Sequence, residues 1–230
     1  MARIPENFRR NPPILANYDA VDIASGTGYV TFYGGRMGIN GTIAGGNTSD
    51  LYVLSPEQFY SDTFVSNGAA FTGTAFLKNI DLDFDIMFNL PRTLKGQMIV
   101  NLTMGRQHTQ TTLKIDMYPI IYVRKWDGST ETAIANATGN EFRPSVDTTG
   151  VYLKMACIPI TIPTTHFKRG DFLRVTIELW GKTDSASLTG VLLLGNDPMG
   201  RLTQDGLSVF TFPAGYTSLL SVHAPFRMDL

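Results

Sequence analysis

Residues 172–180 alternate between apolar and polar side chains, and this pattern constrains the fold more than any other stretch. One face would carry Leu173, Val175, Ile177 and Leu179, and the other Arg174, Thr176, Glu178 and Trp180. Successive side chains of a strand project to opposite faces of a sheet, so a period of two predicts a half-buried antiparallel strand. Turn residues flank it within 166–199, and we expect the next strand, 191–195, to follow as the second half of a hairpin.

The same period recurs along most of the chain and predicts about ten strands. Further strands are expected near residues 80–88, 98–104, 113–123, 151–162 and 217–230. No amphipathic helix and no internal repeat is visible, and 22 Gly and 12 Pro favour many turns. We therefore predict an all-β fold: an antiparallel two-sheet sandwich of the jelly-roll type, formed as one domain by residues 18–230.

Residues 1–17 have a different composition and are predicted to form an extended N-terminal arm. Three prolines favour extended backbone, and three arginines give the arm positive charge. We expect the arm to lie along a neighbouring subunit, and the alternative is a frayed terminus. Its candidate interface residues are Arg3, Ile4, Phe8, Arg9, Arg10, Ile14 and Leu15.

The strand near residues 113–123 is apolar on both faces. Opposite its core face it carries Tyr118, Ile120 and Tyr122, which are further interface candidates. Burial on both faces is typical of a central sandwich strand, or of a strand whose outer face meets another subunit. The sequence leaves both interpretations open.

The alternation in residues 151–162 changes parity between Cys157 and Ile158. We interpret the change as a bulge, or as a strand that passes from one sheet to the other. Pro159 and Pro163 favour a sheet edge. The single cysteine excludes an intramolecular disulfide, and its place in the apolar alternation predicts a buried, inert thiol.

Charge and hydropathy exclude several classes of protein. The net charge of −1 argues against a nucleic-acid-binding protein. The N-terminus has no apolar region typical of a signal peptide, and Val191–Leu194 is the longest aliphatic run, far below the ~20 residues of a membrane span. We therefore expect a soluble protein made in a cytoplasm, with no membrane partner and no specific nucleic-acid partner.

No motif with catalytic spacing is present, so we predict no enzymatic activity, catalytic residue, cofactor or metal. His166 and His223 are interpreted as surface histidines, and no histidine has metal-ligand spacing with another one or with the cysteine. Asp81, Asp83 and Asp85 lie on one face of a strand. They indicate a solvated face or one that meets a basic partner, and a calcium site is the alternative.

Several stretches resemble β-sandwich virion proteins of tailed bacteriophages. These stretches are Tyr18–Tyr29, Gly170–Gly181, Leu193–Pro198 and Ala224–Leu230. The resemblance implies a capsid-decorating or minor capsid component that has no enzymatic activity, and it transfers no site residues.

We therefore expect a non-enzymatic structural virion protein, assembled in the host cytoplasm, that oligomerises and binds a capsid or tail surface. Its expected partners are copies of itself and a major capsid or other virion protein. One alternative is a carbohydrate-binding, lectin-like module or adhesin, with Trp126, Trp180 and Tyr33 as the aromatic candidates. Another is a glycoside hydrolase, which needs two carboxylates roughly 5–10 Å apart.

Overall fold

The computed structural model describes residues 27–38, 50–61, 65–108, 113–143, 150–201 and 217–227, and these residues form an all-β molecule. The strands are β1 (Thr27–Gly38), β2 (Asp50–Ser55), β3 (Val65–Asn67), β4 (Leu77–Met87), β5 (Arg92–His108), β6 (Ile115–Trp126), β7 (Glu131–Thr138), β8 (Gly150–Phe167), β9 (Phe172–Thr183), β10 (Val191–Gly195) and β11 (Ser221–Arg227). No helix long and apolar enough to cross a membrane occurs in these ranges. The predicted all-β, antiparallel class is confirmed.

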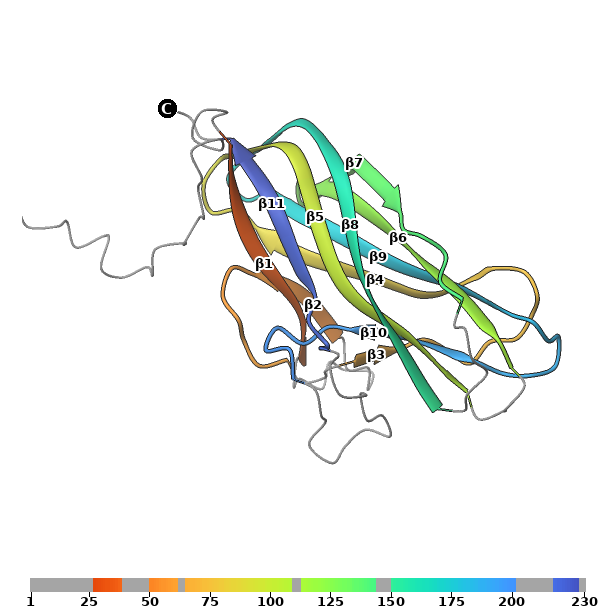
Figure 1. Ribbon diagram of the computed structural model, residues 1–230. Coiled ribbons are helices and arrows are strands. Elements are labelled where there is room, and N and C mark those ends of the chain that lie inside the picture. The colour runs from red at the N-terminus through yellow and green to blue at the C-terminus, as the bar shows by residue number, and fades with distance from the viewer. Residues whose placement is uncertain are drawn as a thin grey trace, which may run out of the picture.

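The strands pair in one curled sheet. Its order is β3-β10-β5-β11-β1-β2-β4-β9-β6-β7, and β8 also pairs with β5. All pairings are antiparallel except β2 with β4, which meet at Val53 and Asp85. Figure 1 shows β1, β11, β5 and β8 as one layer, with β4, β9 and β6 behind it. The division into two separate sheets stays a prediction, because β1 pairs with β11 and then with β2 and so links the layers.

The core lies between the two layers, and β9 behaves as its alternation predicts. Leu173, Val175, Ile177 and Leu179 are fully buried in the main apolar cluster. The core faces of β4, β5 and β6 complete this cluster, with Phe84, Met98 and Ile121 among its fully buried side chains. The prediction of a hairpin is wrong, however. β9 pairs with β4 and β6, whereas β10 pairs with β3 and β5, because the chain crosses to the other layer after residue 183.

The parity change in β8 has another cause than the one predicted. β8 pairs with β5 without interruption from Gly150 to Ile162, so there is no bulge at residues 157 and 158. Ile158, Ile160 and Ile162 face the main core, whereas Leu153, on the opposite face, packs into a small second cluster with Val65 and Leu193. The parity changes because the first part of β8 buries one face and the later part buries the opposite face.

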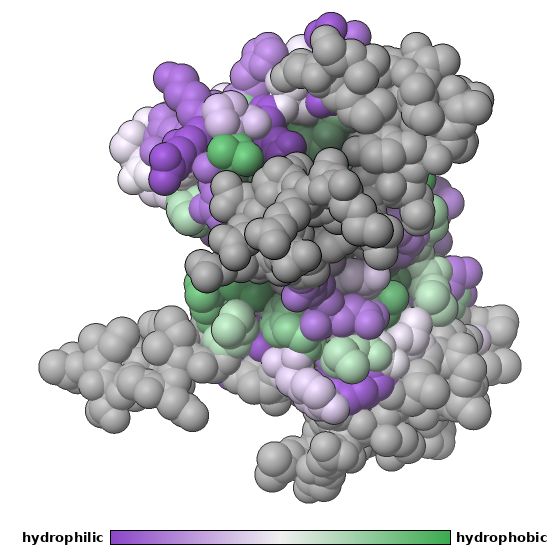
Figure 2. All heavy atoms as spheres, turned by 90° about the vertical axis from the view of Figure 1, so that its left-hand side faces the viewer, coloured by the Kyte–Doolittle hydropathy of each residue, from purple (hydrophilic) through white to green (hydrophobic). Residues whose placement is uncertain are grey.

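Cys157 lies on this second face of β8 beyond the small cluster, and it is exposed, which contradicts the predicted buried thiol. The edge position that Pro159 and Pro163 predict is confirmed, since among the described strands β8 is hydrogen-bonded to β5 alone. Seen from the β1 side, hydrophobic and hydrophilic residues lie next to each other on the described surface (Figure 2).

Candidate functional site

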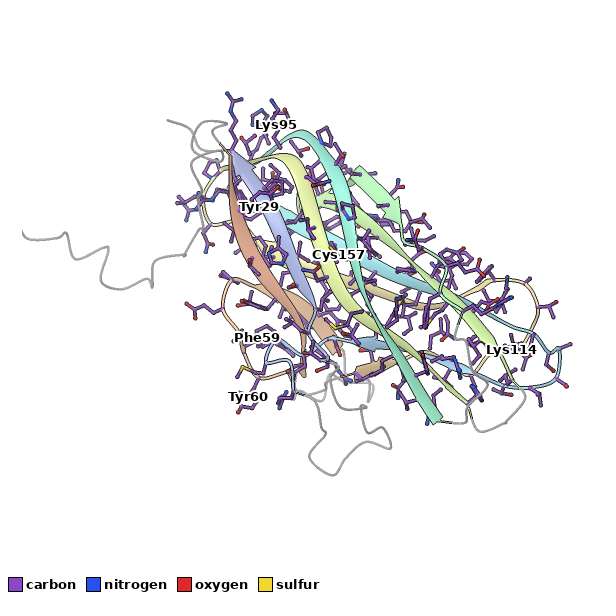
Figure 3. All side chains as sticks on the ribbon, viewed as in Figure 1. Tyr29, Phe59, Tyr60, Lys95, Lys114 and Cys157 are labelled. Atoms are coloured by element: carbon purple, nitrogen blue, oxygen red, sulfur yellow. The ribbon has the colours of Figure 1, made fainter. Side chains whose placement is uncertain are left out.

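A polar cluster lies on the outer face of the layer formed by β1, β11, β5 and β8. β11 runs between β1 and β5, and this register brings Ser221 next to Tyr33 on one side and Asn101 on the other. Ser221 and His223 are two residues apart on one strand, so their side chains share a face. Figure 3 labels Tyr29 on β1 and Cys157 on β8, the two strands that flank β11 and β5 in this layer.

His223 is held by hydrogen bonds at both ring nitrogens. Thr31 Oγ1 lies 2.9 Å from Nδ1, and Asn101 Nδ2 lies 3.0 Å from Nε2. An amide NH₂ group can only donate, so Nε2 accepts and Nδ1 carries the proton, which it donates to the Thr31 hydroxyl. The partners therefore select the neutral tautomer, with the proton on Nδ1 and the accepting electron pair on Nε2.

Ser221 lies at this basic nitrogen. Its Oγ is 3.4 Å from His223 Nε2, and the Asn101 amide also donates to it over 3.4 Å. Ser221 is 4% exposed and His223 is half-buried. Burial lowers the pKa of His223 below its ordinary value of 6.5, because the charged imidazolium loses its hydration. The imidazole is therefore uncharged at neutral pH.

These four side chains have the order of groups that acyl transfer uses: a hydroxyl, a neutral imidazole 3.4 Å from it, and an amide donor beside both. Ser221 is in reach of a neutral base, and apo structures show such contacts longer than the reacting complex does. Thr31 orients the base from the far side of the ring. The Asn101 amide is a donor beside the nucleophile, where an oxyanion develops in ester cleavage. A hydroxyl stabilises an imidazolium less than the carboxylate of a Ser-His-Asp set, so we expect slow turnover.

Sequence reasoning missed this cluster because its residues come from three strands far apart in the chain. His223 was expected to be a surface histidine, but it is half-buried among three partners. His166 is exposed, as expected, and its Nδ1 contacts Thr93. The only signal in the sequence was Ser221 and His223 at a spacing of two within a strand, and this spacing alone has no catalytic specificity.

The opposite layer carries a charged outer face on β4, β9, β6 and β7. Arg174 on β9 forms a two-pronged contact with Asp85, at 2.8 and 2.7 Å, and reaches Glu131 on β7 at 2.8 Å. Asp83 accepts from Thr176 at 2.5 Å and Asp81 pairs with Lys78 at 2.6 Å. The sequence predicted that these aspartates face solvent or a basic partner. Within this chain, Arg174 and Lys78 are such basic partners.

The calcium alternative finds no support in this face. Across the described ranges, no three His, Cys, Asp or Glu side chains are grouped so that they could hold a metal ion.

The three interface candidates on the outer face of β6 are half-buried. They are Tyr118, Ile120 and Tyr122. The Tyr118 ring stacks on Trp180 with centroids 6.4 Å apart, and Arg124 lies 4.9 Å above the Tyr122 ring. β6 is a central strand between β9 and β7, so neighbouring strands account for much of this burial. A subunit contact at this face stays a prediction.

The seven arm candidates, from Arg3 to Leu15, lie outside the described residues.

The structure does not bring together the three aromatic residues of the lectin-like alternative. Trp126 and Trp180 lie on the charged outer face, where Arg174 covers Trp126 at 5.9 Å and Glu178 accepts the indole N–H of Trp180 at 2.8 Å. Tyr33 lies on the opposite layer, next to Ser221.

Comparisons with known proteins give a likeness in fold. No family model and no curated protein matches the sequence. Among solved structures, an α-amino acid ester hydrolase aligns with 86% of this chain at 10% identity and a TM-score of 0.50. A CocE/NonD family hydrolase from Staphylococcus aureus aligns with 87% at 12% identity and a TM-score of 0.45. The chain spans only 36% and 37% of these two hydrolase chains.

A chain in the structure of infectious bursal disease virus, Gx strain, also aligns, over 88% of this chain and 56% of its own length, at 11% identity and a TM-score of 0.31. This is a weak likeness to a viral β fold. None of the structures named above is a protein of a tailed phage, and the finer resemblance to virion proteins of tailed phages is not shown.

The expectation of a non-enzymatic, capsid-decorating or minor capsid protein is contradicted by these comparisons. The structure that shares the fold at a TM-score of 0.50 is an α-amino acid ester hydrolase. The expectation failed because it rested on short strand sequences, and alternating strands with Gly-Asp turns are common to unrelated β proteins.

Proposed function

We propose that this protein is a hydrolase of carboxylic esters, with Ser221 as the nucleophile and His223 as the general base. The observation that carries the proposal is the hydrogen-bonded set of Ser221, His223, Asn101 and Thr31 on the outer face of β11. The likeness in fold to an α-amino acid ester hydrolase agrees with this chemistry. Because the chain spans about a third of that protein, its activity is assigned from its own residues.

The reaction runs in two halves through an acyl-serine. Ser221 Oγ attacks the acyl carbon while its proton passes to His223 Nε2, and the Asn101 amide turns its N–H from Nε2 to the negative oxygen that forms. The C–O bond to the alcohol then breaks, and His223 returns the proton to the leaving alkoxide. Water repeats the steps on the acyl-serine and releases the acid, which restores Ser221 and neutral His223.

Thr31 is a positioning residue in this scheme, because it contacts only the far nitrogen of His223. Its hydroxyl keeps the proton on Nδ1 and stabilises the imidazolium that forms during the reaction. Thr31→Val should therefore move the acid limb of the pH–rate profile to lower pH, whereas Thr31→Ser should retain the wild-type profile. A merely structural residue would change the rate without moving that limb.

The test is the steady-state hydrolysis of p-nitrophenyl esters by the full chain and four variants. We expect Ser221→Ala to reduce hydrolysis to the buffer rate and His223→Gln to lower kcat/KM by about 10²–10⁴-fold. Asn101→Ala should lower kcat by about 10²-fold, the usual effect of removing one oxyanion donor. Cys157→Ser, which removes an exposed thiol outside the cluster, should retain full activity.

Thermal unfolding of each variant separates lost catalysis from lost folding. Activity that survives in folded Ser221→Ala, or that disappears in Cys157→Ser, overturns the assignment of the nucleophile. A wild-type chain that is folded and hydrolyses no ester above the buffer rate overturns the proposed function.

We propose a location in a virus particle separately, and the weak likeness to a chain of infectious bursal disease virus is compatible with it. A hydrolase carried on a particle agrees with both proposals. Peptide mass spectrometry of purified particles tests the location. Peptides of this chain in stoichiometric amounts support it, and their absence contradicts it.

A further inference from the structure

The strand segments around the Ser221–His223 pair carry no formal charge. They are residues 29–35 of β1, 219–225 around β11, 97–103 of β5 and 155–161 of β8, and none contains Asp, Glu, Lys or Arg. Charged residues make up 17% of the whole chain, so four neighbouring strand segments of seven residues each without one are a marked local departure. The opposite layer carries the charged network of Arg174.

Apolar and uncharged side chains surround the pair instead. In register with His223 lie Thr31 on β1, Ile99 on β5 and, one strand further, Pro159 on β8. In register with Ser221 lie Tyr33 and Asn101. The Tyr29 hydroxyl is already used, because it donates to the backbone oxygen of Gln97 at 2.9 Å.

We propose that the site takes esters of uncharged, apolar acyl groups and discriminates against α-amino acyl esters. An α-amino ester brings an ammonium group within two bonds of the reacting carbon. A cation next to a half-buried site needs a carboxylate or several acceptors, and its desolvation costs several kcal/mol without them. The four described segments supply no carboxylate, whereas Ile99 and Pro159 offer apolar contact to an alkyl chain. This inference rests on the proposed function and specifies its substrate class.

The test compares p-nitrophenyl butyrate with the p-nitrophenyl ester of alanine, at pH 7 and with the Ser221→Ala rate subtracted. We expect kcat/KM for the butyrate to exceed that for the alanine ester by at least about 10-fold, the effect of 1.4 kcal/mol. Pro159→Asp places a carboxylate on the exposed side of β8, where it can pair with the ammonium group. This variant should raise kcat/KM for the alanine ester and so lower the butyrate-to-alanine ratio. Thr161→Ala, on the same face, is the matched control and should leave the ratio unchanged.

Each outcome separates the two proposals. If the alanine ester is cleaved as fast as the butyrate, or faster, and the activity depends on Ser221, the proposed function holds and the acyl preference is wrong. If neither ester is cleaved by the folded protein, the proposed function fails and this inference fails with it.

Discussion

At the scale of single residues, the behaviour of His223 follows from its burial. Its pKa lies below 6.5, so the base form dominates at neutral pH and is lost only in acid. We expect kcat/KM to stay constant above about pH 6.5 and to fall below it with an apparent pKa under 6.5. The pH–rate profile on p-nitrophenyl butyrate measures this value. An apparent pKa above 6.5 would mean that a neighbouring negative charge, absent from the described segments, governs the ring.

The same residue links pH to stability. The unfolded chain takes up a proton on this histidine near pH 6.5, whereas the folded chain does so only at lower pH. The unfolded state therefore binds more protons in this window, and the free energy of unfolding decreases as the pH falls below 6.5. Urea unfolding of wild type and His223→Gln between pH 5 and 7.5 should show a smaller decrease in the variant. If the free energy of unfolding fell equally with pH in wild type and His223→Gln, His223 would not link pH to stability.

Arg174 should be the most sensitive residue of the charged face. Its guanidinium contacts Asp85 and Glu131 while its side chain is only 22% exposed. Arg174→Met leaves these carboxylates without their main cation, and we expect a loss of about 1–3 kcal/mol in the free energy of unfolding. Arg92→Met, at an exposed position, is the control. Urea unfolding measures both variants. If Arg174→Met and Arg92→Met lost equal free energy of unfolding, the ion pairs of Arg174 would contribute little to stability.

At the scale of strands, β5 is the most closely packed element, because β8 lies on one side and β10 and β11 on the other. Gly105 sits where β8 and β10 both approach. A Cβ there would lie 2.5 Å from Leu153 Cδ2 and 2.8 Å from the Tyr152 carbonyl oxygen. We expect Gly105→Ala to cost about 1–3 kcal/mol, since backbone cannot move aside as a side chain can. Thermal unfolding measures it against exposed Thr161→Ala, and an unchanged midpoint would contradict the packing.

Alternation in the sequence predicts strands well and their partners poorly. The core faces of β4, β6, β9 and β11 are as expected, since a period of two depends only on local geometry. The pairing of β9 with β4 and β6 in place of β10 depends on contacts across the whole chain. The site was missed for the same reason: only the sheet order places Asn101 and Thr31 next to His223.

At the scale of the molecule, the two outer faces differ in character. One layer exposes the charged network of Arg174, and the other surrounds the Ser221–His223 pair with uncharged side chains. This asymmetry suits a site whose base must stay neutral, because a nearby carboxylate would raise the pKa of His223.

Self-association through the arm of residues 1–17 and the outer face of β6 also belongs to this scale and remains a prediction. Light scattering on the full chain and on a variant without residues 2–17 tests it. We expect a smaller mass for the truncated protein with an unchanged unfolding midpoint. A monomer in both cases would contradict the role of the arm.

The most direct test of the central claim is to trap the nucleophile. A fluorophosphonate reacts with an activated serine and leaves a covalent phosphonate, which peptide mass spectrometry locates on one residue. We predict a single adduct on Ser221, absent from Ser221→Ala and strongly reduced in His223→Gln. No adduct on the folded protein, or an adduct on another residue, would contradict the assignment of Ser221 and His223 as a catalytic pair.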